Sequence, residues 1–209
     1  MQQIHRFADA CEHLKVHEYK SKRMIISDQN DKPMRIQIPR MHMPWGCSSF
    51  TPDAGDPKYN LDFTLQGFDD EETAVGKFHA SLRQIESKII DEVVAQSEAI
   101  FGSKRPRAEI EAMWNSNVKE SAGDYDPKFR VKVMGTVDNG VRAECFSGED
   151  KRRLSDKLEP RLYSGNSGKA IVELSSVYFM NKMIGCVWKL SQLLVYEPER
   201  LTGFDNFQL

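Results

Sequence analysis

Cations occupy every second position of one short segment. In KFRVKV, Lys128, Arg130 and Lys132 alternate with apolar residues, which predicts a strand with one charged and one apolar face. Cations side by side on one face of a strand repel one another, and a polyanion lying across that face would offset the repulsion. The alternative is a charged strand that keeps the edge of a sheet from pairing with other molecules.

Two large aromatic side chains, Trp45 and Phe50, lie in a segment from 43 to 57 that is rich in Gly, Ser and Pro. A large ring is harder to bury in such a loop than in a strand. Cations that bind phosphates, next to rings on which bases stack for about 1–3 kcal/mol each, are what single-stranded nucleic acid needs. For Trp45 the alternative is a plug that closes the open end of a barrel.

Basic residues also gather in two other segments, 20–42 and 149–169. Acidic residues interrupt both, so an ordinary solvated surface is the alternative to a polyanion-binding face. The basic residues are Lys20, Lys22, Arg23, Lys32, Arg35 and Arg40 in the first segment, and Lys151, Arg152, Arg153, Lys157, Arg161 and Lys169 in the second, where Tyr163 lies among them.

No local signature of catalysis or of metal binding is found. SGNSGKA, residues 164–170, lacks the spacing and the Ser or Thr of a phosphate-binding loop, and it runs into a predicted strand. His13 and His17 are four residues apart but have no third ligand beside them. Asp69 and Asp70 are explained as the cap and dipole partners of a helix. We therefore predict no catalytic residues, no metal, no cofactor and no enzymatic activity.

The totals are those of an ordinary globular protein: 209 residues with a net charge of -2, which gives no global attraction to nucleic acid. No apolar run reaches the roughly 20 residues of a membrane span, and the start MQQIHRFADACEHLK is too polar and acidic for a targeting peptide. Widely spaced cysteines predict reduced thiols inside a cell. They are Cys11, Cys47, Cys145 and Cys186.

The first half of the chain changes from an alternating to a helical pattern. After weak helical spacing in the first 18 residues, strands are predicted at 23–29, 33–39 and 58–66. From Asp69 onward apolar residues recur every three or four positions, which predicts a long amphipathic helix that Gly102 and Pro106 end. A shorter helix is expected at 107–119.

Strands resume in the second half of the chain. The segment 128–135 is expected to form a hairpin with 141–146 through an Asp-Asn-Gly turn, and 170–180 to pair with 184–197 around Asn181-Lys182. This order predicts a mainly β (α+β) protein with an oligonucleotide-binding (OB) fold-like five-stranded barrel and a long helix between the third and fourth strands. Other β architectures capped by a helix fit the same order.

Within the third strand, one face is apolar and the other polar. The interior of the barrel is expected to receive Tyr59, Leu61, Phe63 and Leu65, and the outer face Asn60, Asp62, Thr64 and Gln66. Asp62 would be a poor neighbour for a phosphate. Tyr59, at the start of the strand, is also a candidate for stacking on a base.

Several of these segments together resemble single-stranded DNA-binding proteins of nucleocytoplasmic large DNA viruses, a family related in fold to the single-stranded DNA-binding protein of T7-like phages. The resemblance covers about residues 20–196. It is carried by WGCSSF…PKYNLDF, by AIFG at the helix end, by FRVKV, and by VYFMNKMIGCVWKLSQLLV.

The resemblance implies an OB-fold barrel that coats and protects single-stranded DNA in replication, recombination or repair of a giant-virus genome, as a homo-oligomer (dimer) without enzymatic activity. It places the protein in the host cytoplasm or nucleus at sites of viral replication, or packaged in the virion, and not in a membrane. The phage relatives carry an acidic C-terminal tail that contacts replication proteins. Here Glu197, Glu199 and Asp205 are joined by Arg200, and the chain ends in Leu209, which departs from that pattern.

We predict an N-terminal extension (1–19), a nucleic-acid-binding domain (20–196, helical insertion about 70–120) and a tail (197–209). The alternative function is a structural or assembly protein of a virion, with the barrel as a protein interaction module; a nuclease is a weaker one. The predicted DNA-binding residues are Lys22, Arg35, Arg40, Trp45, Phe50, Lys58, Tyr59, Lys128, Arg130, Lys132, Arg152 and Arg153.

Overall fold

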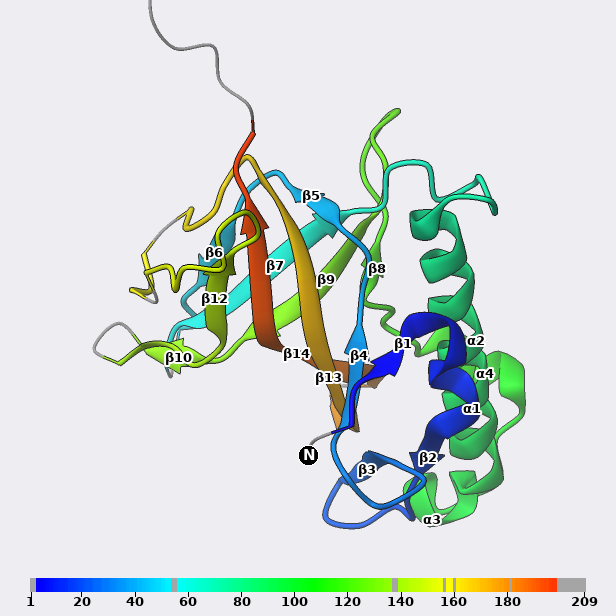
Figure 1. The fold of residues 1–209 in the computed structure, drawn as a ribbon. Coiled ribbons are helices and arrows are strands. Elements are labelled where there is room, and N and C mark those ends of the chain that lie inside the picture. The colour runs from blue at the N-terminus through cyan, green and yellow to red at the C-terminus, as the bar shows by residue number, and fades with distance from the viewer. Residues whose placement is uncertain are drawn as a thin grey trace, which may run out of the picture.

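Five strands close into a barrel in the computed structural model, which describes residues 3–53, 56–136, 139–155, 157–159, 161–180 and 182–198 (Figure 1). Around the ring, β5 pairs with β7, β7 with β9, β9 with β14, β14 with β13, and β13 again with β5. The strands are β5 (Met41–Met43), β7 (Lys58–Thr64), β9 (Lys128–Val133), β13 (Asn166–Met180) and β14 (Met183–Tyr196). The predicted OB-like barrel is confirmed.

The apolar faces of β7 and β9 fill the interior of this barrel. Leu61 and Phe63 are buried, and Phe63 lies opposite Phe129 of β9. The ring of Phe129 meets that of Trp188 on β14 edge-on, with centroids 5.3 Å apart. Such edge-to-face pairs add to the free energy of burial. Tyr59 is also buried, at 9% exposure, as the alternation predicts.

The long helix α2 (Ala74–Ala95) covers one side of the barrel, where Phe78 packs edge-on against Phe129 (Figure 1). The helix begins later than predicted because Thr73 is its N-cap: the Thr73 hydroxyl accepts a hydrogen bond from the Gly76 N–H at 2.9 Å. Asp69 and Asp70 therefore precede the helix instead of capping it. A short helix α3 (Ser97–Phe101) follows.

The predicted end of this helical region is confirmed, but the next helix is shorter than expected. Gly102 ends α3 in the left-handed region, with φ of 76°, which glycine adopts at low cost. Helix α4 (Arg107–Ala112) ends before the predicted residue 119 because the residues that follow it pair with the sheet. Trp114 bridges to β14, and β8 (Val118–Lys119) pairs with β9.

Short strands extend the barrel on both sides. β1 (His5–Arg6) pairs with β4 (Met34–Gln37), and β2 (Leu14–Val16) pairs with β3 (Arg23–Asp28). The first 18 residues thus combine short strands with two short helices, η1 (Phe7–Asp9) and α1 (Ala10–His13), instead of one helical stretch. β6 (Cys47–Phe50) pairs with the start of β7.

The predicted hairpin between 128–135 and 141–146 forms only next to its turn. Within the described residues, β10 (Gly135–Thr136) and β11 (Gly140–Val141) form an antiparallel ladder of two residues, and β12 (Glu144–Ser147) then pairs in parallel with β14. Residues 144–147 thus pair with the free edge of β14 and not with β9. The predicted pairing of 170–180 with 184–197 is confirmed as β13–β14, where Met180 lies opposite Met183.

The helices of the described residues include none that is both long enough and apolar enough to cross a membrane. The predicted tail lies outside the described residues, except Glu197 and Pro198.

Candidate functional site

The outer face of β7 and β9 carries an array of polar side chains. The antiparallel register places Asn60 opposite Lys132, Asp62 opposite Arg130 and Thr64 opposite Lys128. Because successive side chains alternate between faces, these three pairs share the side that points away from the barrel core. Strand β9 pairs with β7, with β8 and with β14, so it is not at an edge of the sheet. The predicted cationic face of β9 is therefore the outer face of a central strand of the barrel.

Two hollows adjoin on this face. The first has a volume of about 540 Å³ and lies over Lys58, Asn60 and Lys132. The second, about 860 Å³, lies over Asp62, Thr64 and Lys128. Lys119 and Arg130 line both hollows, so we treat the two as one continuous groove, named here the β7–β9 groove.

Three exposed aromatic side chains stand in the β7–β9 groove. Phe50 lines the first hollow and is 62% exposed, whereas Trp45 and Tyr125 line the second and are 57% and 79% exposed. Trp45 is thus an accessible ring and not a buried plug of the barrel. Exposed rings of this size are costly unless something covers them, which makes them candidate contacts for a flat apolar ligand.

Arg130 makes the best-defined polar contact of the groove. Its Nε and Nη2 groups donate to the two carboxylate oxygens of Asp62, at 2.7 and 2.8 Å. This two-point hydrogen bond to a carboxylate raises the pKa of Arg130 above its ordinary value. Arg130 therefore stays cationic at the boundary between the hollows.

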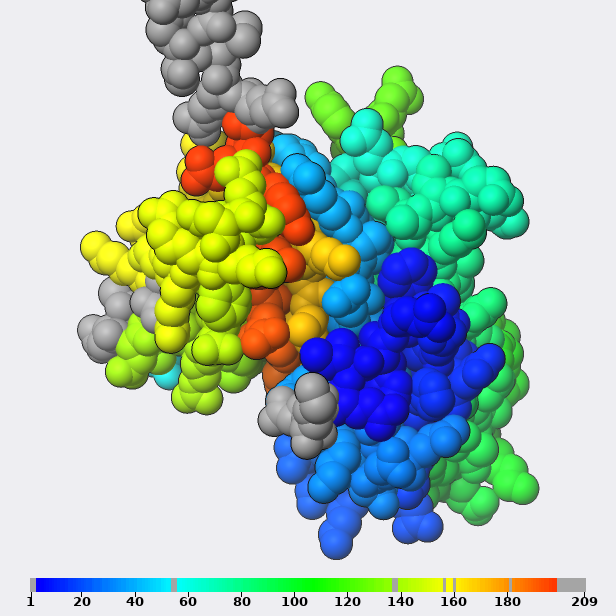
Figure 2. Space-filling view, viewed as in Figure 1, coloured from blue at the N-terminus to red at the C-terminus, as the bar shows by residue number. Residues whose placement is uncertain are grey.

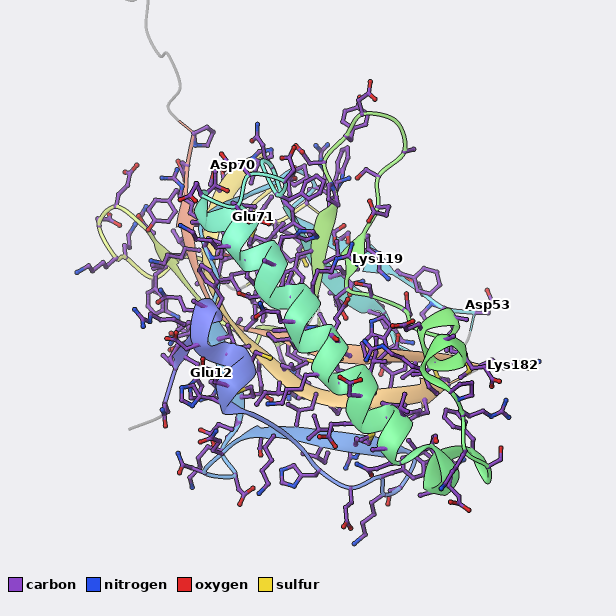
Figure 3. The ribbon with its side chains drawn as sticks, turned by 90° about the vertical axis from the view of Figure 1, so that its right-hand side faces the viewer. Glu12, Asp53, Asp70, Glu71, Lys119 and Lys182 are labelled. Carbon is purple, nitrogen blue, oxygen red and sulfur yellow. The ribbon has the colours of Figure 1, made fainter. Side chains whose placement is uncertain are left out.

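Lys119 comes from β8, which pairs with β9 and places Lys119 opposite Lys128. Its Nζ donates to Asn115 Oδ1 at 2.6 Å. Desolvation by burial lowers the pKa of Lys119, and the positive charge of Arg130 lowers it further because the two cations repel each other. In Figure 3, α2 crosses in front of the barrel and Lys119 lies to one side of it, toward the loop of Asp53.

The segment after β8 forms the outer wall of the second hollow. Residues 120–127 rise from the surface as a projecting loop, green at the top of Figure 2. Lys128, at its end, donates to Ser121 Oγ at 2.7 Å, and Ser121 Oγ donates to Asp126 O at 2.8 Å, so the base of the loop is tied to the sheet. Tyr125 is carried by this loop.

The structure brings together half of the predicted binding residues. Those that line the β7–β9 groove are Trp45, Phe50, Lys58, Lys128, Arg130 and Lys132. They come from three separate parts of the chain, which β6, β7 and β9 place side by side.

The other predicted cations lie elsewhere. Arg35 is engaged with Glu173 at 3.6 Å, and Arg40 lies 4.1 Å from the centre of the Tyr196 ring. Lys22 is in the β2–β3 turn, with φ of 60°. Arg152 pairs with Asp150 at 3.6 Å, in the segment after β12 that Figure 2 shows in yellow at the left, away from the 120–127 loop.

Two further predicted residues also lie outside the groove. Arg153 bridges to Phe146 in the same segment as Arg152. Tyr59 is in the barrel core, so little of its ring is available to a base.

Sequence reasoning missed Lys119, Tyr125, Asn117 and Tyr178, which all line the groove. Tyr125 carried the same signal as Trp45, because it lies in a segment rich in Gly, Asp and Pro. Lys119 gave no such signal: it was assigned to a helix, and only its pairing in β8 aims it at the groove.

The motifs that sequence analysis set aside do not converge on this groove. Residues 164–170 turn through Gly165 and enter β13. His17 lies 2.7 Å from the Ser27 hydroxyl, whereas His13 stacks near His5, with ring centroids 4.7 Å apart. Among the described residues, no group of three or more His, Cys, Asp or Glu side chains is placed to hold a metal ion.

The chain resembles known proteins in fold and not in sequence. No protein-family model and no curated protein sequence matches it. The crystal structure of gp2.5, a single-stranded DNA-binding protein encoded by bacteriophage T7, aligns with a TM-score of 0.50 at 12% identity, over 83% of this chain and 94% of that one. At this identity the likeness concerns the fold alone.

Two further structures are more distant. The single-stranded DNA-binding protein from bacteriophage Enc34 aligns with a TM-score of 0.44 at 13% identity, over 93% of this chain and 96% of that one. Its complex with single-stranded DNA aligns at 0.41 and 12% identity, over 92% and 99% of the two chains.

Proposed function

We propose that this protein binds single-stranded DNA with little preference for sequence. The observation that carries the proposal is the β7–β9 groove, which exposed aromatic rings and cations line together, with Asp62, Glu120 and Asp126 as the acidic residues of its second hollow. The likeness of the barrel to that of the T7 phage protein supports the proposal at the level of the fold.

The chemistry of the groove matches the two parts of a nucleotide. Lys58, Lys128 and Lys132 supply positive charge for phosphates, and Trp45, Phe50 and Tyr125 supply rings on which bases can stack. Stacking depends on the π-face that every base has, so it selects single strands without selecting a sequence. A duplex keeps its bases stacked on each other and offers only its phosphates.

In its finer form, the proposal is a protein that coats and protects single strands during viral DNA replication, recombination or repair. It acts inside the host cell as a dimer, with residues 20–196 as the binding domain and without catalysis of its own. The tail at 197–209 contacts replication proteins. These points rest on the family resemblance of the sequence.

Fluorescence anisotropy of a labelled oligothymidylate tests the proposal. Titrations across a salt series, with and without unlabelled duplex competitor, should give tight binding that weakens with salt and resists the duplex. Equal competition by duplex would make the protein a general polyanion binder. No binding at low salt would reject nucleic-acid binding altogether.

A separate hollow, outside the groove, favours the alternative of a protein interaction module in a virion. It has a volume of about 530 Å³, lies between α3 and the β13–β14 turn, and is lined by Phe101, Phe179, Met180 and Met183. Met180 and Met183 are 58% and 45% exposed. Recovery of the protein from purified particles, together with absence of oligonucleotide binding, would support this alternative.

A further inference from the structure

An acidic side chain in the middle of a cationic groove needs an explanation. Asp62 stands on the outer face of β7, directly opposite Arg130. Its side chain is nevertheless only 6% exposed, whereas that of Arg130 is 43% exposed. The guanidinium therefore covers most of the carboxylate, and a ligand in the groove meets mainly Arg130.

The pairing leaves one edge of the Arg130 guanidinium unused. A guanidinium has five N–H donors, and Asp62 takes one from Nε and one from Nη2. Three donors remain, two on Nη1 and one on Nη2. One N–H of Nη1 and one N–H of Nη2 point in parallel from the edge of the guanidinium that faces away from Nε. Two parallel donors of this kind can bind two oxygens of one phosphate.

Within the described part of the chain, no hydrogen bond from Arg130 Nη1 is present. The guanidinium plane is nonetheless held by two short hydrogen bonds to a nearly buried partner. An arginine fixed in this way loses less conformational entropy on binding than a mobile one.

Lys119 adds a second cation at the same place. It lines both hollows, as Arg130 does. Among the described residues its ammonium donates one hydrogen bond, to Asn115, which leaves two of its three N–H donors unused. Two cations that line one junction and repel each other favour an anion between them.

We propose that the junction of the two hollows is a binding site for one phosphodiester group, with Arg130 donating from its Nη1–Nη2 edge, Lys119 donating beside it, and Asp62 as the residue that positions Arg130. This inference deepens the proposed single-stranded DNA binding and rests on it. It explains why an acid is tolerated there, and it distinguishes Arg130 from the other cations of the groove, whose role requires only charge.

Exchange of arginine and lysine tests the site. Arg130→Lys keeps the charge but removes the two-donor edge, so its affinity for labelled oligothymidylate should fall roughly tenfold, nearly as far as that of Arg130→Ala. The matched control is Arg152→Lys, the same exchange at an exposed arginine outside the groove, which should bind within about twofold of the wild type. Equal affinity of Arg130→Lys and wild type would overturn the proposal.

The role of Asp62 is tested by coupling. In an Asp62→Asn background the guanidinium loses its second acceptor, so the further change Arg130→Lys should cost little affinity. Both members of that comparison carry the same added charge, which removes general electrostatics from the result. An unchanged tenfold loss in the Asp62→Asn background would show that Asp62 does not position Arg130.

Thermal unfolding accompanies each variant, because removal of one partner of a nearly buried ion pair can destabilise the fold. If Asp62→Asn does not fold, the single comparison of Arg130→Lys with Arg152→Lys still decides on the phosphate site. Failure of the wild type to bind oligothymidylate rejects the proposed function, whereas binding that is insensitive to Arg130→Lys rejects only this site.

Discussion

Trp45 is the residue at which stacking can best be separated from charge. Its ring is more than half exposed in the second hollow, so Trp45→Ala should leave the melting temperature almost unchanged. Loss of one stacked base should lower the affinity for oligothymidylate by about 1–3 kcal/mol, with little change in salt dependence. Anisotropy titrations at several salt concentrations measure both quantities.

Trp45→Phe is the control for this substitution, since it keeps an aromatic face and should retain most of the affinity. A variant Trp45→Ala that binds as well as the wild type would remove Trp45 from the site. One that unfolds would show that the ring supports the fold.

Lys119 makes the affinity sensitive to alkaline pH. Burial, and then the charge of Arg130, lower its pKa below the ordinary 10.5. A phosphate beside Lys119 would raise that pKa, so binding takes up a proton once the free protein has lost it. The affinity should therefore be constant below the free pKa and fall as the pH rises through it, earlier than for an exposed lysine.

Titrations of oligothymidylate binding from neutral to alkaline pH measure this decline. Lys119→Arg, which keeps its charge over the whole range, should shift the decline to higher pH. An identical pH profile in Lys119→Arg would assign the decline to another group.

Single residues differ in how well the sequence predicts them. The accessibility of Trp45 and Phe50 follows from their loop composition, and the outward face of β9 follows from alternation. The role of Asp62 does not, because its burial depends on the partner that β9 brings opposite to it. For Tyr59 the alternation predicts burial in the barrel, and the structure buries it.

At the scale of elements, the turn between β3 and β4 depends on one carboxylate. Asp28 Oδ1 accepts from the backbone N–H groups of Asn30 and Lys32, at 2.8 and 2.9 Å. Asp28→Ala removes this buried acceptor from the turn and should lower the free energy of unfolding by about 1–3 kcal/mol. Urea denaturation measures the change.

The same carboxylate contributes to acid sensitivity. Burial of Asp28 by itself raises its pKa, but the hydrogen bonds from Lys32 and Asn30 together with the interaction with His5 outweigh burial, and the net pKa is lower than 3.8. A lowered folded pKa means that this stabilisation is present above the unfolded pKa and is lost as the pH falls through the folded one. Asp28→Asn should flatten the acid limb of the stability curve; a limb as steep as that of the wild type would contradict this.

Elements with a long, regular pattern of apolar residues could be predicted from the sequence. Short segments that could pair with more than one sheet edge could not. Helix α2 and the β13–β14 pair each have a strong pattern of their own. By contrast, 141–146 and 113–119 have little intrinsic preference, and the edges of β14 and β9 decide where they pair. Sequence periodicity does not show which sheet edge is vacant.

At the scale of the whole molecule, the groove is assembled from segments far apart in the chain. β6, β7, β8 and β9 contribute to it across a helical insertion that separates β7 from β8. Sequence reasoning therefore found the cations and rings but could not tell which of them converge, and it included Arg35, Arg40 and Arg152, which other elements hold elsewhere.

The net charge of -2 gives no global attraction to DNA, so attraction must come from local clusters of cations such as that of the groove. Its lining cations are Lys58, Lys119, Lys128, Arg130 and Lys132. If Arg130 and Lys119 share one phosphate and each of the other three lysines neutralises one, the logarithm of the binding constant should fall with the logarithm of salt concentration with a slope of about -2.8. Lys58→Gln, at one end of the groove, should reduce that slope by about 0.7. A wild-type slope near zero would mean that stacking acts without phosphate contacts, whereas a slope roughly twice as steep as expected would require a strand path that continues beyond the groove onto the cations of the β2–β3 turn or of the segment after β12.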